Sequence, residues 1–206
     1  MAASSIEYNY KVILLGGVGV GKTALFNRIK LDEFHENVGT APSTIGSDVY
    51  RFSTTIGDDK VNVSLWDTAG AELFSTLPTN YYRDTSGALL VYCVEDNYTF
   101  ESLQEWIDDA DRYINSEETV WALIGNKCDL YNEVEEYRVA AQCKRMSTDL
   151  CYQCSAKTGE NVMEAFQDII ASIHKNQAAT KLQQSTKGDQ PINIYEEQKS
   201  SHRCSC

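Results

Sequence analysis

The stretch Gly16-Gly17-Val18-Gly19-Val20-Gly21-Lys22-Thr23 fits the pattern G-x-x-x-x-G-K-[ST]. It follows the mostly apolar run 10–15, which has the character of a buried parallel strand, and opens a segment near 23–30 that predicts a helix. In this context glycines let successive backbone N–H groups turn inward, and the helix N-terminus adds partial positive charge. We expect the loop to bind phosphate groups. The alternative is a glycine-rich turn that binds nothing.

Lys22 and Thr23 carry the groups that a nucleoside triphosphate and its metal ion require. The Lys22 ammonium can neutralise charge on the β- and γ-phosphates, which makes it a candidate catalytic residue, and the Thr23 hydroxyl can ligate Mg²⁺. The predicted nucleotide contacts in this part of the chain are Gly17, Val18, Gly19, Val20, Gly21, Lys22, Thr23 and Ala24.

Strand-like and helix-like segments alternate along the rest of the chain. Strands are expected at 49–56 and 60–66, joined by the hairpin signal at 57–59, and at 88–94, 120–124 and 149–154. Helices are expected at 100–114, 135–146 and 162–175. This order predicts an α/β fold, a doubly wound and mostly parallel six-stranded sheet with helices on both faces.

Composition indicates one globular domain with polar ends. The chain has 206 residues, of which 42% are apolar. We expect a domain at 8–175, a flexible N-terminus at 1–7 and a flexible polar tail at 176–206. A net charge of −12 argues against nucleic acid as a partner, because that partner needs a basic face. We expect no membrane-spanning run and no secretory signal.

A second motif, Asp67-Thr68-Ala69-Gly70, closes the predicted strand 60–66. The carboxyl ends of strands line the ligand crevice of a doubly wound sheet. Asp67 is therefore expected to reach Mg²⁺ through a bound water. The Gly70 N–H is expected to approach the γ-phosphate, which makes Gly70 a candidate catalytic residue. Taken alone, an aspartate in this position is more typical of a helix cap.

Two further motifs follow later strands and suit a purine base. In Asn126-Lys127-Cys128-Asp129, the Asp129 carboxylate can accept two hydrogen bonds from guanine, whereas adenine offers no such donor pair. The stem of Lys127 can cover the face of the base. The predicted base contacts are Asn126, Lys127 and Asp129 with Ser155, Ala156 and Lys157, and the Ala156 N–H is a candidate donor to guanine O6.

The chain has seven cysteines, which we expect to stay reduced. Cys151 and Cys154 form one C-x-x-C pair, but no second pair accompanies it as a zinc site would require. We interpret the pair as part of a short strand, with metal or redox chemistry as the alternative.

Together these motifs resemble the Ras superfamily of small GTPases. Several segments are similar to its Rab branch: Ser43-Thr44-Ile45-Gly46-Ser47-Asp48 to the first switch segment, Tyr81-Tyr82-Arg83 to the second, and Cys204-Ser205-Cys206 to a double-prenylation signal. The resemblance implies a GTP/GDP switch with Mg²⁺ that recruits effectors to membranes in vesicle trafficking. It also implies an exchange factor, an activating protein and a lipid-extracting chaperone as partners, and a monomer on the cytosolic face of an intracellular membrane.

The resemblance adds residue roles to those argued above. It implies that Thr44 ligates Mg²⁺ and senses the γ-phosphate, as a catalytic residue, and that Phe34 packs edge-on to guanine. It also implies an effector surface, exposed in the GTP state, that consists of Ile45, Val49, Trp66 and Tyr81. For Trp66, packing in or beside the core is an equally acceptable interpretation.

The sequence departs from the family pattern where the chemistry is most sensitive. Ala71 stands where the family has a glutamine that orients the attacking water, a residue that the general scheme of GTP hydrolysis depends on. Val18 replaces a glycine beside the γ-phosphate, the segment 34–44 is longer than in typical Rabs, and Val49 replaces a phenylalanine. We therefore expect very slow intrinsic GTP hydrolysis, and the alternative function is an essentially non-hydrolysing binding module. A P-loop kinase or ATPase lacks support because Asp129 selects guanine.

The extreme C-terminus suggests attachment of lipid. Cys204 and Cys206 follow a polar tail that is not strongly basic, and stable anchoring without a basic patch needs two lipid chains. We expect prenylation of both cysteines; the alternative is a pair of free thiols.

Overall fold

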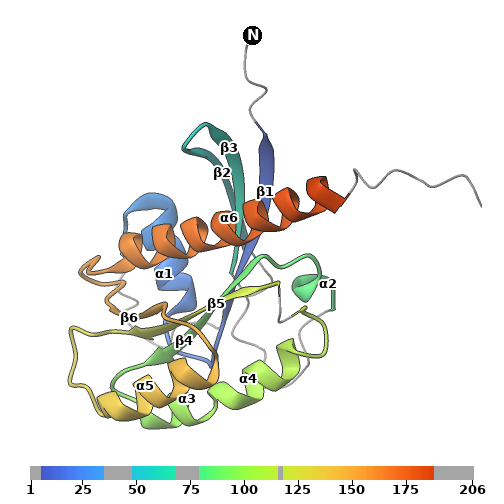
Figure 1. The fold of residues 1–206 in the computed structure, drawn as a ribbon. Coiled ribbons are helices and arrows are strands. Elements are labelled where there is room, and N and C mark those ends of the chain that lie inside the picture. The colour runs from blue at the N-terminus through green and yellow to red at the C-terminus, as the bar shows by residue number, and fades with distance from the viewer. Residues whose placement is uncertain (1–5, 35–47, 68–78, 116–117, 188–206) are drawn as a thin grey trace, which may run out of the picture.

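Six strands form one sheet within the described part of the chain, which covers residues 6–34, 48–67, 79–115 and 118–187 of this computed structural model. Their order across the sheet is β2-β3-β1-β4-β5-β6 (Figure 1). The bounds are β1 Glu7–Leu15, β2 Asp48–Ile56, β3 Asp59–Asp67, β4 Gly87–Cys93, β5 Val120–Asn126 and β6 Cys151–Cys154. Only β2 and β3 pair antiparallel among these strands, so the predicted mostly parallel sheet is confirmed.

Strand β1 shows why the sheet is covered on both faces. Its residues alternate between two hydrophobic clusters: Val12 and Leu14 belong to one, and Ile13 and Leu15 to the other. All four are fully buried. Side chains of a strand alternate between the two faces of a sheet, so an uninterrupted apolar run requires a layer on each side.

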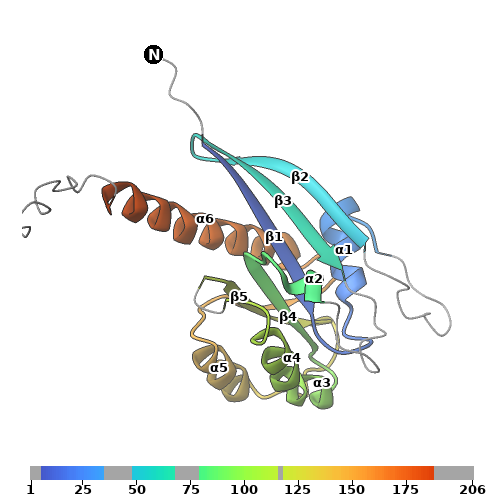
Figure 2. The ribbon, with the colours of Figure 1, turned by 90° about the vertical axis from the view of Figure 1, so that its right-hand side faces the viewer.

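Helices supply these layers (Figure 2). One face carries α1 Lys22–Leu31 and α6 Val162–Lys187. The other carries α2 Thr79–Tyr82, α3 Asn97–Glu101, α4 Leu103–Ala110 and α5 Glu136–Arg145. The predicted helix 100–114 is thus wrong in its bounds, because two shorter helices meet at Ser102, whose hydroxyl donates to the Thr99 carbonyl (3.1 Å).

Helix α6 is longer than predicted. It continues to Lys187, so the expected end near residue 175 is wrong and the proposed tail boundary at 176 falls inside the helix. The helix contacts β1 on both sides of the predicted end. Tyr10 Oη lies 2.8 Å from His174 Nδ1, and beyond residue 175, Lys181 Nζ lies 3.6 Å from the centre of the Tyr8 ring. These contacts hold the helix against the sheet where apolar periodicity has faded. Residues 188–206 lie outside the described part.

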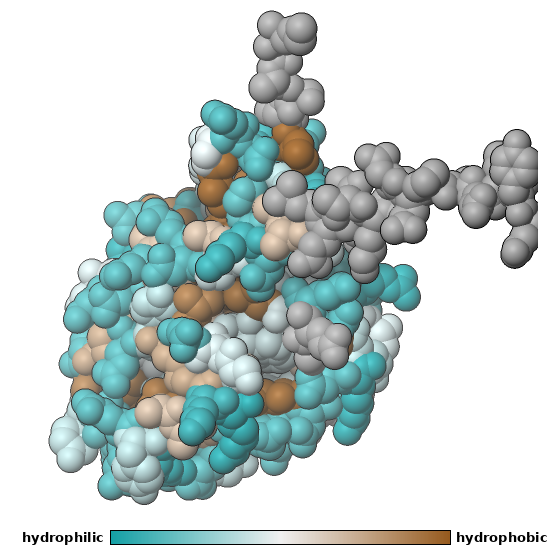
Figure 3. Space-filling model, in the orientation of Figure 1, coloured by the Kyte–Doolittle hydropathy of each residue, from teal (hydrophilic) through white to brown (hydrophobic). Residues whose placement is uncertain are grey.

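The surface in view is largely hydrophilic, with small apolar areas between polar ones (Figure 3). None of the described helices combines the length and the apolar character that a membrane crossing needs.

One expectation about the cysteines is wrong. The structure joins Cys143 near the end of α5 to Cys151 at the start of β6 in a disulfide, with 6.6 Å between the Cα atoms. The turn between the two elements brings them together, since the Thr148 N–H donates to the Cys143 carbonyl (3.1 Å). The strand interpretation of 151–154 is confirmed, and Cys154 is a buried free thiol.

Candidate functional site

The loop between β1 and α1 has a backbone shape that its glycines make possible. Gly16, Gly19 and Gly21 have φ angles of 140°, 77° and 96°, in the region that side chains disfavour. A Cβ on Gly16 would lie 2.1 Å from the Val91 carbonyl oxygen, and one on Gly21 would lie 2.3 Å from Asn126 Nδ2. The glycines therefore serve both the turn and the close packing of the loop against β4 and β5.

Lys22 begins α1 and turns back across this loop. Its side chain is buried, and Nζ donates to the carbonyls of Gly16 (2.6 Å) and Gly17 (3.0 Å). The loop thus holds the Lys22 ammonium group against its own backbone, which keeps this cation within the predicted phosphate site.

Asn126 connects the loop of 16–21 to the loop that follows β6. Its side chain is only 1% exposed; Nδ2 donates to the Val20 carbonyl (2.8 Å), and Oδ1 accepts from the Ala156 N–H (3.1 Å). Each of these segments follows the carboxyl end of a parallel strand, which places them along one edge of the sheet. One amide therefore joins the predicted phosphate and base regions.

The Ala156 amide, a candidate donor to guanine O6, donates to Asn126 Oδ1 in the structure. Its contact with guanine stays a prediction. The Ala156 N–H and the side-chain oxygen Oδ1 of Asn126 are both buried. Buried donors need a hydrogen-bond acceptor, and Oδ1 supplies it here.

Asp129 is held by the neighbouring loop. Ser155 Oγ donates to Asp129 Oδ1 (2.5 Å) and accepts from the Thr158 N–H (3.0 Å). Asp129 itself is exposed, as a carboxylate that receives a base must be. Lys127 is half-buried with a φ of 66°, Lys157 is exposed, and Phe34 packs beside the core that contains α1.

Two thiols near this loop, Cys128 and Cys154, have a raised pKa. Burial, with the carboxylates of Glu160 and Asp129, raises the pKa of Cys128, and burial raises the pKa of Cys154 to about 12. Both thiols stay protonated at neutral pH, so neither offers the thiolate that covalent or metal chemistry needs.

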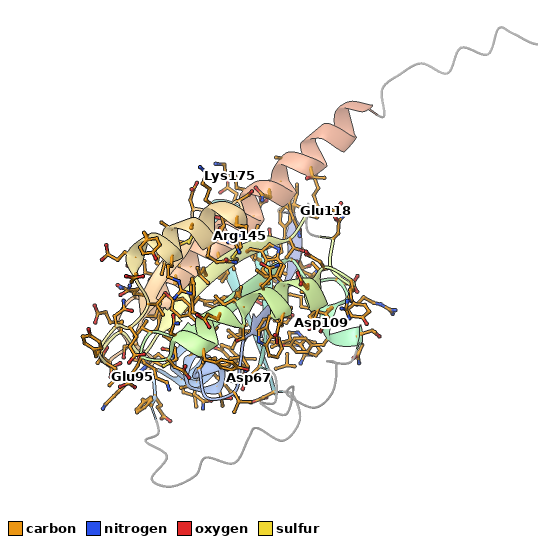
Figure 4. All side chains as sticks on the ribbon, turned by 90° about the horizontal axis from the view of Figure 1, so that it is seen from below. Asp67, Glu95, Asp109, Glu118, Arg145 and Lys175 are labelled. Atoms are coloured by element: carbon orange, nitrogen blue, oxygen red, sulfur yellow. A yellow bond between two sulfur atoms is a disulfide. The ribbon has the colours of Figure 1, made fainter. Side chains whose placement is uncertain are left out.

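The predicted magnesium ligands include Thr23, half-buried in α1, and Asp67, fully buried at the end of β3. Asp67, the last residue of β3, is labelled in Figure 4, which shows the molecule from below. A hydroxyl and a carboxylate are the hard oxygen donors that suit Mg²⁺, which takes few protein ligands and adds substrate phosphates. The described residues contain no cluster of three or more His, Cys, Asp or Glu that could bind a metal alone. Thr44, Gly70 and Ala71 lie outside the described part.

The expected effector surface is only partly accessible. Tyr81 is 4% exposed in this structure, and its hydroxyl donates to the Trp66 carbonyl (3.0 Å); its exposure in a GTP-bound state stays a prediction. The Trp66 ring is half-buried edge-to-face against Tyr81, with Lys11 Nζ 4.5 Å from its centre. Val49 is half-buried opposite Trp66 in the register of β2 and β3, and Ile45 lies outside the described residues. A buried tyrosine normally needs a partner for its hydroxyl, and the Trp66 carbonyl supplies it here.

Sequence analysis did not single out Arg28, although it contacts the predicted base loop. Its guanidinium reaches from α1 to the carbonyls of Ala156 and Lys157. Arg28 belongs to none of the nucleotide-binding motifs in the sequence, so only the tertiary structure reveals its contacts with the Ala156 and Lys157 carbonyls.

Comparison with known proteins agrees with this arrangement. A sequence model of the Ras family matches residues 11–175. The chain is 32% identical to GTP-binding protein YPTM1 of Zea mays over 208 aligned positions, which cover 98% of each chain. It is 34% identical to GTP-binding protein YPT1 of Saccharomyces cerevisiae over 186 positions, covering 89% of this chain and 88% of the yeast protein. It is 35% identical to Ras-related protein RABA6b of Arabidopsis thaliana over 170 positions, covering 82% and 72%.

Proposed function

Because the chain belongs to the Ras superfamily of small GTPases, in its Rab branch, we propose that it is a GTP/GDP switch that recruits effector proteins to a membrane. The glycine loop and Lys22 bind the phosphates, and Asp129 selects guanine. Thr23, Thr44 and Asp67 hold Mg²⁺, which neutralises charge on the phosphates when bound.

The observation that carries this proposal is the Asn126 bridge between the Val20 carbonyl and the Ala156 amide. It brings a phosphate-binding motif and a purine-binding motif to one edge of the sheet, which suits a ligand with both parts. Neither motif alone would distinguish a nucleotide switch from a phosphate-binding turn.

Calorimetry on nucleotide-stripped protein with Mg²⁺ tests the proposal. We expect uptake of GDP and GTP and no measurable uptake of ADP or ATP. Asp129→Asn should weaken GDP binding and favour xanthosine diphosphate. Guanine has an exocyclic amine that donates a hydrogen bond to a carboxylate, whereas xanthine has a carbonyl there, which accepts one from the asparagine amide. If the wild type bound neither guanine nucleotide, the proposal would be wrong.

We infer that GTP hydrolysis by the protein alone is very slow. Val18 is 41% exposed in the glycine loop, so its branched side chain is free to crowd an attacking water or an incoming arginine. Ala71 cannot orient that water, because a methyl group neither donates nor accepts a hydrogen bond. An activating protein can still supply the missing groups in trans.

This second proposal has its own test. In a single-turnover assay, Ala71→Gln and Val18→Gly should each accelerate hydrolysis of bound GTP, and the double variant should be fastest. Wild-type hydrolysis as fast as that of the double variant would contradict the inference. If the double variant is faster but wild-type turnover equals the spontaneous hydrolysis of GTP in buffer, the result would support the alternative, a guanine-nucleotide-binding module that is switched by exchange alone.

We further propose that prenyl groups on Cys204 and Cys206 attach the protein to the cytosolic face of an intracellular membrane. Its cycle there would involve an exchange factor, an activating protein and a lipid-extracting chaperone, in vesicle trafficking. The two terminal cysteines and the need for two lipid chains support this. Intact mass from eukaryotic cells should exceed that of the unmodified chain by two prenyl groups, and Cys204→Ser with Cys206→Ser should abolish both the increase and membrane association.

A further inference from the structure

Arg28 makes an unusual set of contacts for a residue in the middle of a helix. Nε donates to the Ala156 carbonyl (2.9 Å) and Nη2 to the Lys157 carbonyl (2.8 Å). Nη1 donates to the Asp32 carbonyl (2.8 Å) and to Asp32 Oδ1 (3.0 Å). The Arg28 side chain is only 13% exposed; its bond to Ala156 is partly buried, whereas its bonds to Lys157 and Asp32 lie at the surface.

The acceptors lie in two different parts of the chain. Ala156 and Lys157 belong to the loop after β6, more than 120 residues from Arg28, whereas Asp32 ends α1. The Asp32 N–H also donates to the Arg28 carbonyl (3.0 Å), and Asp32 has a φ of 55°. Arg28 therefore fixes the end of its own helix and the neighbouring loop at the same time.

Ala156 is consequently held through both of its backbone groups. Its N–H donates to Asn126 Oδ1 and its carbonyl accepts from Arg28 Nε. The planar guanidinium suits this task, because its donors point in fixed directions and can bind two successive carbonyls, which a lysine ammonium cannot do with the same geometry. Bonds from a charged donor are also stronger than bonds between neutral groups.

We propose that Arg28 is a positioning residue for guanine-nucleotide retention: it fixes the loop 155–157 against the helix that begins at the phosphate loop. This inference rests on the proposed function. Arg28 acts through the loop rather than through the ligand, so its role is the lifetime of the bound state and not the chemistry of hydrolysis. Because the contacts lie on the base side of the site, the nucleotide's number of phosphates should not alter the effect.

The test is the dissociation rate of fluorescently labelled GDP and of a non-hydrolysable GTP analogue from full-length protein, chased with excess GDP. Arg28→Ala should accelerate dissociation of both by a similar factor, tenfold or more, as expected when bonds to a charged donor are lost. Arg28→Lys, which keeps the charge but not the paired geometry, should give an intermediate rate. The dependence of dissociation on Mg²⁺ concentration should stay as in the wild type.

Arg138→Ala provides a matched control. Arg138 is also a partly buried arginine that ties two elements together, α5 to α3, through Asn97 (2.5 Å) and Glu101 (3.4 Å), but it does not contact the loop 155–157. It should leave dissociation unchanged. If Arg28→Ala and Arg138→Ala accelerated dissociation equally, or if Arg28→Ala left the rate unchanged, the positioning role would be wrong while nucleotide binding stood.

Folding is monitored separately by circular dichroism for each variant. Should Arg28→Ala not fold, the comparison of Arg28→Lys with the wild type decides: equal dissociation rates would overturn the inference, and a faster rate for Arg28→Lys with an unchanged melting temperature would support it. Absence of nucleotide binding by the wild type itself would refute the proposed function instead.

Discussion

Replacing Asn126 by alanine should destabilise the protein far more than its small change in volume suggests. The side chain satisfies two buried groups, the Val20 carbonyl at 2.8 Å and the Ala156 amide at 3.1 Å. An unsatisfied buried donor or acceptor costs about 1–3 kcal/mol, so the two together cost about 2–6 kcal/mol. A domain has a total stability of about 5–15 kcal/mol, so this loss is a large part of it.

Urea denaturation without nucleotide measures the effect. With a slope of about 2 kcal/mol per molar urea, the midpoint should fall by about 1 M or more. Asn62→Ala is the matched control, because its side-chain amide also bonds several groups, but at the surface: Nδ2 donates to Glu7 Oε1 (2.8 Å) and Asn9 Oδ1 (3.0 Å), and Oδ1 accepts from Ser53 Oγ (2.7 Å). Water replaces surface bonds, so this control should change stability by about 0.5 kcal/mol or less.

The two variants should also differ in their response to ligand. Saturating GDP raises stability according to its affinity, and Asn126→Ala should lose much of that increase because the base and phosphate loops are no longer joined. Asn62→Ala should retain it. If Asn126→Ala unfolded within 0.5 kcal/mol of Asn62→Ala, the assignment of two buried and satisfied bonds to this amide would be refuted, since 0.5 kcal/mol is the range of ordinary surface changes.

Three further predictions concern the glycines and the thiols. Gly16→Ala should lower the melting temperature much more than Gly19→Ala. Both glycines have positive φ, but only a Cβ on Gly16 would lie 2.1 Å from the Val91 carbonyl oxygen. Similar melting temperatures of the two variants would contradict this. Burial raises the pKa of Cys154 to about 12, so the folded protein keeps a proton that the unfolded chain loses near pH 9. Stability should therefore fall as pH rises from about 9 toward 12, and Cys154→Ala should flatten this decline in urea titrations at several pH values. Thiol titration of denatured, unreduced protein from bacteria should find five reactive thiols among the seven cysteines if Cys143 and Cys151 are bonded, and seven if they are not.

Much of the fold was predictable because its signals are local. Apolar runs such as 10–15 mark buried strands, and the glycine loop marks the passage from strand to helix. Parallel strands then place the segments at their carboxyl ends along one edge, which is why Asn126 and Ala156 could be expected near the glycine loop. The structure confirms this sheet and its order of elements.

What the sequence did not predict depends on tertiary contacts. The end of α6 was placed near 175 because apolar periodicity fades there, yet Lys181 packs on Tyr8 of β1. The bond from the Tyr81 hydroxyl to the Trp66 carbonyl is likewise a tertiary contact that no sequence motif indicates. Periodicity within one segment carries no information about such partners, because they come from elements distant in sequence.

At Ala156 a local sequence motif coincides with tertiary contacts from two other elements. A motif identifies this residue as part of a base loop, but its function depends on how firmly the loop is held. Asn126 holds the Ala156 amide from β5, and Arg28 holds its carbonyl from α1. Because α1 begins at the phosphate loop and Asn126 also bonds Val20, both attachments lead back to the phosphate side. If the proposed nucleotide site is correct, we expect movement of the loop 155–157 to be coupled to the glycine loop through these two attachments.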